Sequence, residues 1–190
     1  MKSSEAAFRT SVTHPLLINE LSIEGVAGLI GITFCPGKCD LSSGGFRWER
    51  DLGIDLGVIS KWRANAIVTL IEQHEFEMLG VPQLGEQIRA LGIDWHHLPI
   101  VDVAPPDGRF ERGWIQSGPQ LRETLCSGGR VLVHCRGGLG RAGTVAARLL
   151  VDCGVSPSDA VVRVRRARPG AIETHEQQQY VLNLPTKRDF

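Results

Sequence analysis

The sequence predicts an α/β fold in which a single central, mostly parallel sheet is flanked by helices on both faces. Short apolar runs typical of buried strands, such as 28–34, 66–71 and 131–133, alternate along the 190-residue chain with segments of helical spacing. Proline and glycine mark the ends of several of these segments. In such a fold, ligands bind at the carboxyl ends of the strands.

In the first half of the chain, strands are expected at 16–23 and 28–34, and the second is more apolar and therefore more buried. The segment 41–51 is rich in Ser, Gly and Arg and is expected to be a loop. Asp55 stands where it can cap a helix over the apolar positions that follow. The apolar run 66–71 then predicts a central strand.

In the second half, 82–91 is expected to be a helix because a proline stands at its start and Gly92 lies just past its end. The segment 95–99 predicts another strand. A further helix is expected at about 111–127, and the pair Gly118-Pro119 is expected to interrupt or bend it.

Composition and charge narrow the class of protein. Lys plus Arg and Asp plus Glu both number 21, so no overall positive field favours nucleic acid or an anionic membrane. No apolar run approaches the about 18 residues of a membrane span, and residues 1–10 lack the apolar core of a signal peptide. Five cysteines, an odd number, favour reduced thiols. We therefore expect a cytoplasmic protein with a loose segment at 1–14 and a single domain at 15–190.

The stretch 130–143 has the pattern of an anion-binding site. A buried strand is expected to end at Cys135, and a glycine-rich loop separates it from a helix that begins near Arg141. Backbone N–H groups and a helix N-terminus then converge on one point, which favours a phosphate, sulfate or arsenate oxyanion. The same positive field favours the thiolate of Cys135, and Arg141 can hold two oxygens of the bound group. No metal is needed for such chemistry.

His134 and Cys135, followed after five residues by Arg141, resemble the His-Cys-x5-Arg signature of cysteine-dependent protein tyrosine and dual-specificity phosphatases. The inner residues 137–141 are similar to the branch represented by cyclin-dependent kinase inhibitor 3, the kinase-associated phosphatase. The resemblance implies a phosphomonoesterase that forms a cysteinyl-phosphate, needs no cofactor and acts on a phosphorylated protein or a small phosphoester. It implies a phosphate-binding loop that consists of Cys135, Arg136, Gly137, Gly138, Leu139, Gly140 and Arg141.

The segment 100–109 leaves a predicted strand end and carries two candidates for the proton donor. Expelling a phenolate or alkoxide from phosphorus requires an acid, which a cysteine nucleophile does not supply. In the resembling family this acid is an aspartate just after a Pro-Ile strand end, which is the place of Asp102. Asp107 is the alternative, and either aspartate could instead cap the next helix.

The resemblance implies supporting roles for two more residues. His134 is expected to hold the loop and to bias Cys135 toward its thiolate, and a direct role as general base is not expected. The segment 170–177 is similar to the family's Gly-Ala-Ile-x-Thr-x-x-Gln pattern, in which the glutamine positions a water for hydrolysis of the intermediate. We assign this role to Gln177. Many family members have Ser or Thr directly after the loop arginine, where this chain has Ala142.

These motifs also allow other interpretations. Gly138, Gly140 and Gly143 also match the glycine spacing of a dinucleotide-binding motif, which requires an acidic residue at the end of a second strand about 20 residues further on. Asp159 has that distance, but Ser156 and Pro157 predict that it opens a helix instead. Cys35 and Cys39 have the spacing of a metal-binding pair but lack a second pair nearby. A structural loop with an inert buried cysteine is a further alternative.

Two other classes of function are carried as alternatives. Rhodanese-like sulfur transfer also uses a cysteine in an anion-binding loop, although such loops lack the His-Cys-x5-Arg spacing. A phosphopeptide-binding pseudophosphatase would be expected to have lost Cys135 or Arg141, and this chain keeps both.

Overall fold

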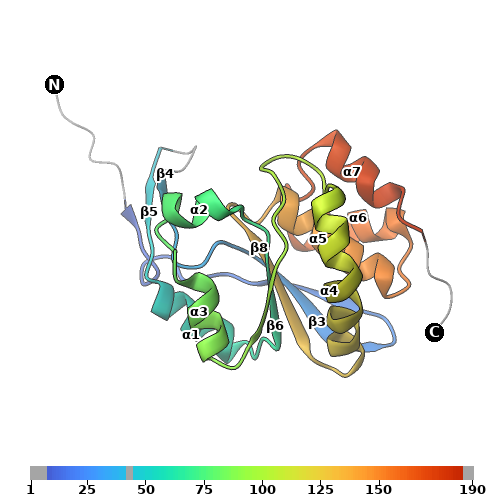
Figure 1. The fold of residues 1–190 in the computed structure, drawn as a ribbon, viewed down its shortest axis with the longest axis horizontal. Helices are drawn as coiled ribbons and strands as arrows, with labels where there is room; N and C mark the ends of the chain where they lie inside the picture. The colour runs from blue at the N-terminus through green and yellow to red at the C-terminus, as the bar shows by residue number, and fades with distance from the viewer. Residues whose placement is uncertain (1–7, 42–44, 186–190) are drawn as a thin grey trace.

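The computed structural model describes residues 8–41 and 45–185. A five-stranded sheet with the order β2-β3-β8-β6-β7 forms its centre (Figure 1). These strands are β2 (Asn19–Ile23), β3 (Val26–Phe34), β8 (Arg130–Cys135), β6 (Ala66–Thr69) and β7 (Asp94–His97). Strand β2 runs antiparallel to β3, and the other neighbours are parallel. The predicted mostly parallel sheet is therefore confirmed.

Helices cover both faces of this sheet, as predicted (Figure 1). Those on one face are α1 (Leu52–Lys61), α2 (Gln73–Met78) and α3 (Leu84–Ala90), and those on the other are α4 (Gly108–Cys126), α5 (Gly140–Asp152), α6 (Pro157–Ala167) and α7 (His175–Leu182). Side chains alternate between the faces along each strand, so that Leu132 packs toward α1 and α3 while Val131 and Val133 pack toward α4 and α5. No helix in the described part of the chain has the length and apolarity to cross a membrane.

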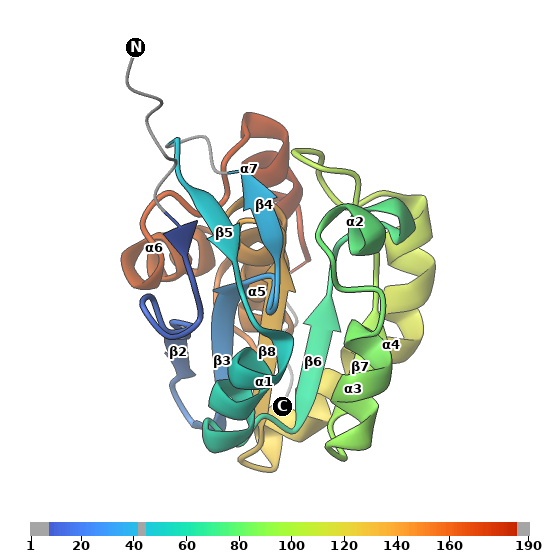
Figure 2. The same ribbon diagram turned by 90° about the vertical axis from the view of Figure 1, so that its left-hand side faces the viewer.

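The sheet register brings the functional segments to one edge. Cys135 pairs with Phe34 at the end of β3, and His134 pairs with Thr69 at the end of β6. Because these strands are parallel, their carboxyl ends meet at the upper edge of the sheet in Figure 2. The loops that leave this edge form the candidate site.

A second, three-stranded sheet lies beyond this edge and has the order β1-β5-β4 (Figure 2). Its strands are β1 (Phe8–Arg9), β5 (Arg47–Glu49) and β4 (Cys39–Leu41). The segment 41–51 was expected to be a loop, but it supplies β5 because its aromatic residues find distant partners. The Arg9 guanidinium lies 3.6 Å from the centroid of the Phe46 ring, and the Trp48 ring lies 5.2 Å from that of Phe34.

The N-terminal segment expected to be loose contributes β1, which pairs in parallel with β5. Residues 1–7 of that segment lie outside the described residues. Ser11 adds a second attachment, because its Oγ donates to the carbonyl of Asp51 at 3.3 Å and accepts the N–H of Asp51 at 3.0 Å. The described end of this segment is thus held against the domain by backbone and side-chain hydrogen bonds.

The expected cap of α1 was assigned to the wrong aspartate. The side chain of Asp51 accepts the N–H of Ile54 at 2.8 Å and caps the helix. Asp55 lies inside the first turn and is buried against Arg50 in a two-fold hydrogen-bonded ion pair. This pairing depends on the second sheet and could not be seen in the local pattern.

Of the two outcomes predicted at Gly118-Pro119, the interruption is wrong, since α4 runs through both residues, and the bend stays a prediction. Gly118 packs so closely on Trp114 that an added Cβ would lie 2.6 Å from the indole nitrogen. Pro119 removes one backbone hydrogen bond, but Leu121 and Leu125 beyond it are buried in the core. Burial on both sides of the proline offsets its local cost.

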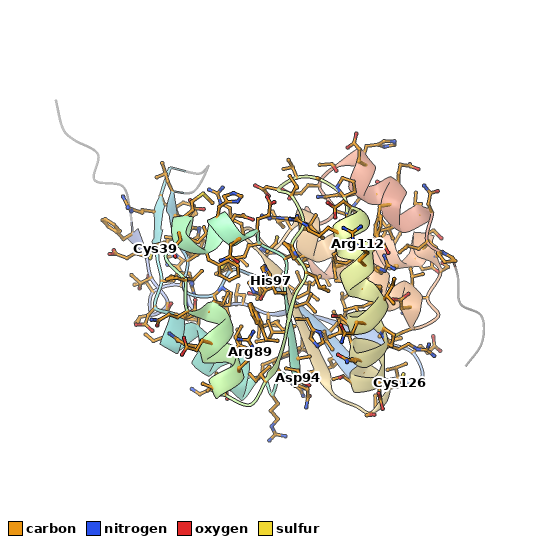
Figure 3. All side chains as sticks on the ribbon, in the orientation of Figure 1. Cys39, Arg89, Asp94, His97, Arg112 and Cys126 are labelled. Atoms are coloured by element: carbon orange, nitrogen blue, oxygen red, sulfur yellow. The ribbon has the colours of Figure 1, made fainter. Side chains whose placement is uncertain are left out.

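The five cysteines are all free thiols. Cys39 and Cys126 are exposed and lie on opposite sides of the molecule (Figure 3). Cys35 is buried beside the site, and burial raises the pKa of its thiol well above the ordinary value. Burial therefore keeps the Cys35 thiol protonated near neutral pH.

Candidate active site

The loop between β8 and α5 is shaped around the sulfur of Cys135. This residue ends β8 and is 3% exposed, and its Sγ accepts the N–H of Gly138 at 3.2 Å. Gly138 has a φ of 69°, and a Cβ there would lie 2.5 Å from the carbonyl oxygen of Thr33. Helix α5 begins at Gly140, and the side chain of its N-cap residue, Leu139, makes no capping hydrogen bond. The sulfur therefore lies beside the positive N-terminus of a helix.

The outer side of the loop is held by cations. Lys38 donates to the carbonyl of Arg136 at 3.1 Å. Arg168 donates to the carbonyl of Gly138 at 3.2 Å and to that of Gly137 at 3.4 Å. Three successive carbonyl oxygens are thus turned outward, an arrangement that leaves backbone N–H groups for the inside of the loop.

Arg141 lies in the first turn of α5 and is almost fully buried. Its Nη1 donates to Glu75 Oε2 at 2.6 Å and to the carbonyl of Ile100 at 3.1 Å, and its Nη2 donates to Glu75 Oε1 at 3.0 Å. Nη2 also lies 2.8 Å from Oδ1 of Asp102. Among the described residues, the buried Nε of Arg141 has no hydrogen-bond partner. A buried donor without a partner is costly, and an oxyanion in the loop would satisfy it.

Glu75 is a residue of the candidate site that the sequence did not reveal. It lies in the first turn of α2 with a buried side chain, and its Oε2 also accepts the N–H of Glu72 at 2.7 Å. Burial opposes ionisation of Glu75, yet the hydrogen bond from Arg141 keeps the pKa of the carboxyl below its usual value. Glu72 and Glu75 have capping-box spacing, but that pattern gives no hint of a partner 66 residues away.

Asp102 lies on the loop after β7, with a side chain that is 53% exposed. Its Oδ1 accepts the N–H of Val103 at 3.1 Å in addition to its contact with Arg141. Val103 has a φ of 56°, an uncommon conformation for a β-branched residue. Backbone strain of this kind persists where surrounding contacts impose it, and here it accompanies the turn that presents Asp102 to the phosphate-binding loop.

Asp107, the alternative acid, caps α4. Its Oδ1 accepts the N–H groups of Phe110 at 2.9 Å and Arg109 at 3.0 Å. The pKa of Asp107 is lower than its ordinary value, mainly because its carboxylate accepts the hydrogen bond from the Phe110 N–H. The capping role that the sequence allowed for either aspartate is therefore filled by Asp107.

Gln177 is buried at the start of α7 and connects three segments of the site. Its side-chain oxygen accepts the N–H of Glu173 at 3.0 Å, and its amide nitrogen donates to the carbonyl of Ala104 at 3.1 Å. A Cβ added at Gly140 would lie 2.9 Å from both amide atoms. Glu173 also caps the loop helix, because its Oε2 accepts the Gly140 N–H at 2.7 Å. Gln177 thus lies between the Asp102 loop and the first residue of α5.

His134 is fully buried behind the loop. Its Nε2 is 2.8 Å from Oγ1 of Thr69, which also accepts the indole N–H of Trp95 at 2.8 Å. Burial lowers the pKa of His134 to about 4, so the ring is neutral near pH 7. A neutral ring hydrogen-bonded inside the sheet fits a structural partner of the loop.

The buried neutral His134 predicts a loss of stability in mild acid. An unfolded histidine titrates near pH 6.5, whereas the pKa is about 4 in the folded protein. The unfolded state therefore binds more protons between these values, and the free energy of unfolding falls by up to about 3 kcal/mol as the pH decreases through this range. Urea denaturation of the wild-type protein at about pH 7 and pH 4.5 measures this loss.

His134→Gln should lose less stability over the same range, because it removes the titrating group. Replacing the exposed His175 with glutamine is the matched control and should leave the wild-type slope unchanged. Equal pH slopes in the wild-type protein and His134→Gln would contradict the prediction.

The loop opens into a groove of about 710 Å³ between the two sheets. Residues of the loop between β8 and α5, of the Asp102 loop and of the second sheet contribute to its lining. The lining residues are Phe34, Lys38, Asp40, Leu41, Phe46, Trp48, Asp102, Val103, Arg136, Gly137, Leu139, Arg168 and Glu173.

A family model described as "Swiss Army Knife protein, DSP-PTPase phosphatase domain" matches residues 60–181. Human cyclin-dependent kinase inhibitor 3 is 30% identical over 172 residues, which cover 88% of this chain and 77% of that protein. The probable protein tyrosine phosphatase type IVA A of Dictyostelium discoideum is 33% identical over 104 residues, 54% of this chain. The match spans 61% of the Dictyostelium protein and 46% of bovine protein tyrosine phosphatase type IVA 3.

Solved structures show the same architecture. A kinase-associated phosphatase in which serine replaces the catalytic cysteine is 28% identical, with a TM-score of 0.75 over 88% of this chain and 92% of that one. Tk-PTP in its active form is also 28% identical, with a TM-score of 0.63 over 86% of this chain and 93% of that one. The family match at 60–181 contains Glu75, Asp102, Cys135, Arg141 and Gln177.

Proposed function

Because the chain belongs to the dual-specificity and protein tyrosine phosphatase family, we propose that it is a metal-independent phosphomonoesterase acting through a cysteinyl-phosphate. Phosphotyrosine is the first candidate substrate, and phosphoserine or phosphothreonine is the second. The observation that carries the proposal is the combination of Cys135 Sγ beside a helix N-terminus with the unpartnered buried Nε of Arg141. Both features suit a tetrahedral oxyanion bound directly over the sulfur.

In the first chemical step, the thiolate of Cys135 attacks phosphorus in line. The sulfur–phosphorus bond forms while the bond to the leaving oxygen breaks, and the carboxyl of Asp102 gives that oxygen a proton. The phosphate takes Arg141 Nε and competes with Asp102 for Nη2. The pair observed at 2.8 Å therefore supports a role in which the arriving substrate frees Asp102 to face the leaving group.

In the second step, water attacks phosphorus and the sulfur leaves as thiolate. The carboxylate of Asp102 takes a proton from the water, and Gln177 positions the water. The placement of Gln177 against Gly140 and the Asp102 loop supports this assignment. Inorganic phosphate then departs, and both catalytic groups return to their starting protonation states.

The groove favours a substrate larger than inorganic phosphate. Its aromatic residues Phe34, Phe46 and Trp48 line the groove and offer apolar area to a peptide segment beside the phosphorylated residue. We therefore propose a phosphorylated protein as substrate, and a small phosphoester is the alternative. A kinase is a reasonable candidate partner, because the similar solved structure is described as kinase-associated. A cytoplasmic location stays a prediction.

Hydrolysis of para-nitrophenyl phosphate in the presence of EDTA tests the proposal. The wild-type protein should release nitrophenol at an undiminished rate, and Cys135→Ser should be inactive. Activity abolished by EDTA, or retained in Cys135→Ser, would refute the mechanism. A parallel assay of sulfur transfer from thiosulfate to cyanide distinguishes the rhodanese-like alternative.

Ala142 predicts slow breakdown of the intermediate. Where many family members have a hydroxyl next to the loop arginine, this chain has a buried methyl group, and the hydroxyl of Thr144 donates to the carbonyl of Gly140 at 2.8 Å. A missing hydrogen bond to the leaving thiolate costs about 1.5–3 kcal/mol, or roughly ten- to a hundredfold in rate. We expect a pre-steady-state burst of nitrophenol and a faster steady state in Ala142→Ser. Rapid-quench kinetics with no burst and an unchanged rate in Ala142→Ser would show that other groups stabilise the thiolate.

A further inference from the structure

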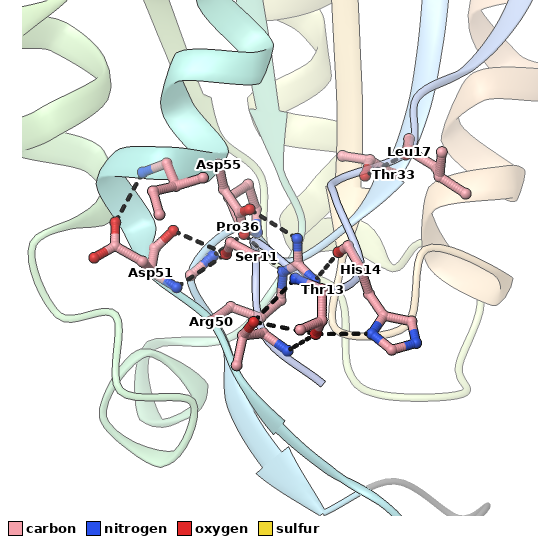
Figure 4. A network of polar contacts seen from close by, with 12 residues as sticks. Ser11, Thr13, His14, Leu17, Thr33, Pro36, Arg50, Asp51 and Asp55 are labelled. Carbon is pink, nitrogen blue, oxygen red and sulfur yellow. Dashed lines mark hydrogen bonds and ion pairs between the residues drawn. The ribbon is translucent and has the colours of Figure 1, made fainter. Parts of the chain in front are cut away.

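The turn after β3 is fixed by a buried ion pair that no catalytic step uses. Arg50 donates to both carboxylate oxygens of Asp55 at 2.8 Å, and both side chains are fully buried (Figure 4). Asp55 Oδ2 also accepts the N–H of Gly37 at 2.8 Å, and the Arg50 N–H donates to the carbonyl of Lys38 at 3.3 Å. Arg50 further donates to the carbonyl of His14 (Figure 4). These bonds fix the backbone on both sides of Lys38.

Gly37 makes the tight turn possible. It has a φ of 73°, and a Cβ there would lie 2.7 Å from the Cβ of Leu52. After the turn, the N–H of Cys39 donates to the carbonyl of Leu79 at 2.8 Å, which fixes the start of β4. The position of Lys38 is thus determined by the fold and not by its own side chain alone.

Lys38 lines the groove beside the loop between β8 and α5. The residue is 6% exposed, and its Nζ donates to the carbonyl of Arg136, the residue that follows Cys135. Nζ lies 5.1 Å from the centroid of the Phe34 ring and 5.3 Å from that of Trp48. Aromatic faces stabilise a cation without neutralising its charge. Burial lowers the pKa of Lys38, and Asp40 opposes this effect.

The charge of Lys38 is not cancelled by a close partner. Asp40 is the acid that interacts most strongly with the charge of Lys38. However, Arg136 already donates hydrogen bonds to both carboxylate oxygens of Asp40, at 2.8 and 2.9 Å. Within 8–41 and 45–185, Lys38 forms no ion pair. The other charged or titratable groups that face Lys38 or Cys135 are Cys35, Asp40, Arg136, Arg141 and Arg168, and Asp102 and Glu173 line the same groove.

We propose that Lys38 is a positioning residue whose uncompensated positive charge draws the anionic phosphoester into the loop and holds it over Cys135. The identity of the anion as a phosphoester rests on the proposed function. The positive charge of Lys38 near Cys135 does not depend on it. Lys38 and the second sheet lie outside the family match at 60–181.

Alkylation of Cys135 by anionic iodoacetate and neutral iodoacetamide tests this charge without requiring turnover. The ratio of the two rates, followed by mass spectrometry of the Cys135 peptide, reports how strongly the site attracts an anion. We expect Lys38→Met to lower the ratio by roughly tenfold and Lys38→Arg to retain it. Lys38→Gln keeps a donor for the Arg136 carbonyl without the charge, and it should behave like Lys38→Met. Lys61→Met, at the exposed end of α1, is the matched control and should leave the ratio unchanged.

The outcomes separate charge from structure. An unchanged ratio in Lys38→Met, or a wild-type ratio in folded Lys38→Gln, would overturn the proposal. If Lys38→Met unfolds, the alkylation-rate ratios of Lys38→Gln and Lys38→Arg are compared instead, and the proposal requires a lower ratio in Lys38→Gln. In an active enzyme, Lys38→Gln should raise KM for para-nitrophenyl phosphate roughly tenfold with little change in kcat. Absence of hydrolysis in the wild-type protein would count against the proposed function and would leave the alkylation test valid.

Discussion

Asp102→Asn is expected to slow hydrolysis of phenyl phosphate by roughly 10²–10⁴-fold, because this poor leaving group needs a proton as it departs. Release of nitrophenol from para-nitrophenyl phosphate should fall much less in the first turnover, since nitrophenolate leaves without protonation. Asparagine keeps an oxygen that can accept from Arg141, so the variant tests proton transfer more than packing. Single-turnover rates for both substrates give the comparison.

Asp107→Asn is the matched control for this prediction. Asparagine caps helices nearly as well as aspartate, so the stability of α4 should change little. The dependence on leaving group should match that of the wild-type enzyme. If Asp107→Asn shows the selective loss and Asp102→Asn does not, Asp107 is the acid and the assignment is wrong.

Glu75→Ala is expected to lower both stability and activity. The change leaves the guanidinium of Arg141 buried without its two-oxygen partner, and loss of one member of a buried pair costs about 3–5 kcal/mol. A displacement of the guanidinium by about 1 Å would reduce kcat/KM by roughly 10²-fold. Urea denaturation and steady-state kinetics measure the two effects. Glu75→Gln should be milder, because it keeps one acceptor for Arg141.

The exposed Glu77 on the same helix provides the control. Glu77→Ala should change the free energy of unfolding by no more than about 0.5 kcal/mol and should leave kcat/KM unaltered. A Glu75→Ala protein with wild-type stability and activity would show that Asp102 and Ile100 suffice to hold Arg141.

Local sequence patterns predicted the parts of the fold that depend on neighbouring residues. The strand ending at Cys135 and the helix opened by Ser156 follow from an apolar run, from glycines and from a capping hydroxyl. The side chain of Ser156 does accept the N–H of Asp159, so this aspartate opens a helix as predicted. The sequence also indicated the loop and the Asp102 segment, because strand ends of a parallel sheet converge.

The parts that could not be predicted depend on contacts between distant residues. Strand β5 is short and polar, and it is stabilised by Trp48 packing on Phe34 and by a parallel partner at Phe8. Glu75 meets Arg141 across 66 residues, and Arg136 meets Asp40 across 96. No periodicity or spacing in the sequence encodes such pairs. The carboxylate partners of Arg141 and Arg136 can therefore be identified only in the folded chain.

Trapping the phosphoenzyme tests the central claim most directly. Asp102→Asn should form the cysteinyl-phosphate from para-nitrophenyl phosphate but lacks the base that activates water, so the intermediate should accumulate. After mixing with substrate that carries radiolabelled phosphate, acid quenching and peptide mapping should place the label on the peptide containing Cys135. The same treatment of the double variant with Cys135→Ser should give no label there. Release of nitrophenol by Asp102→Asn without label on Cys135, or label on any other residue, would contradict the mechanism.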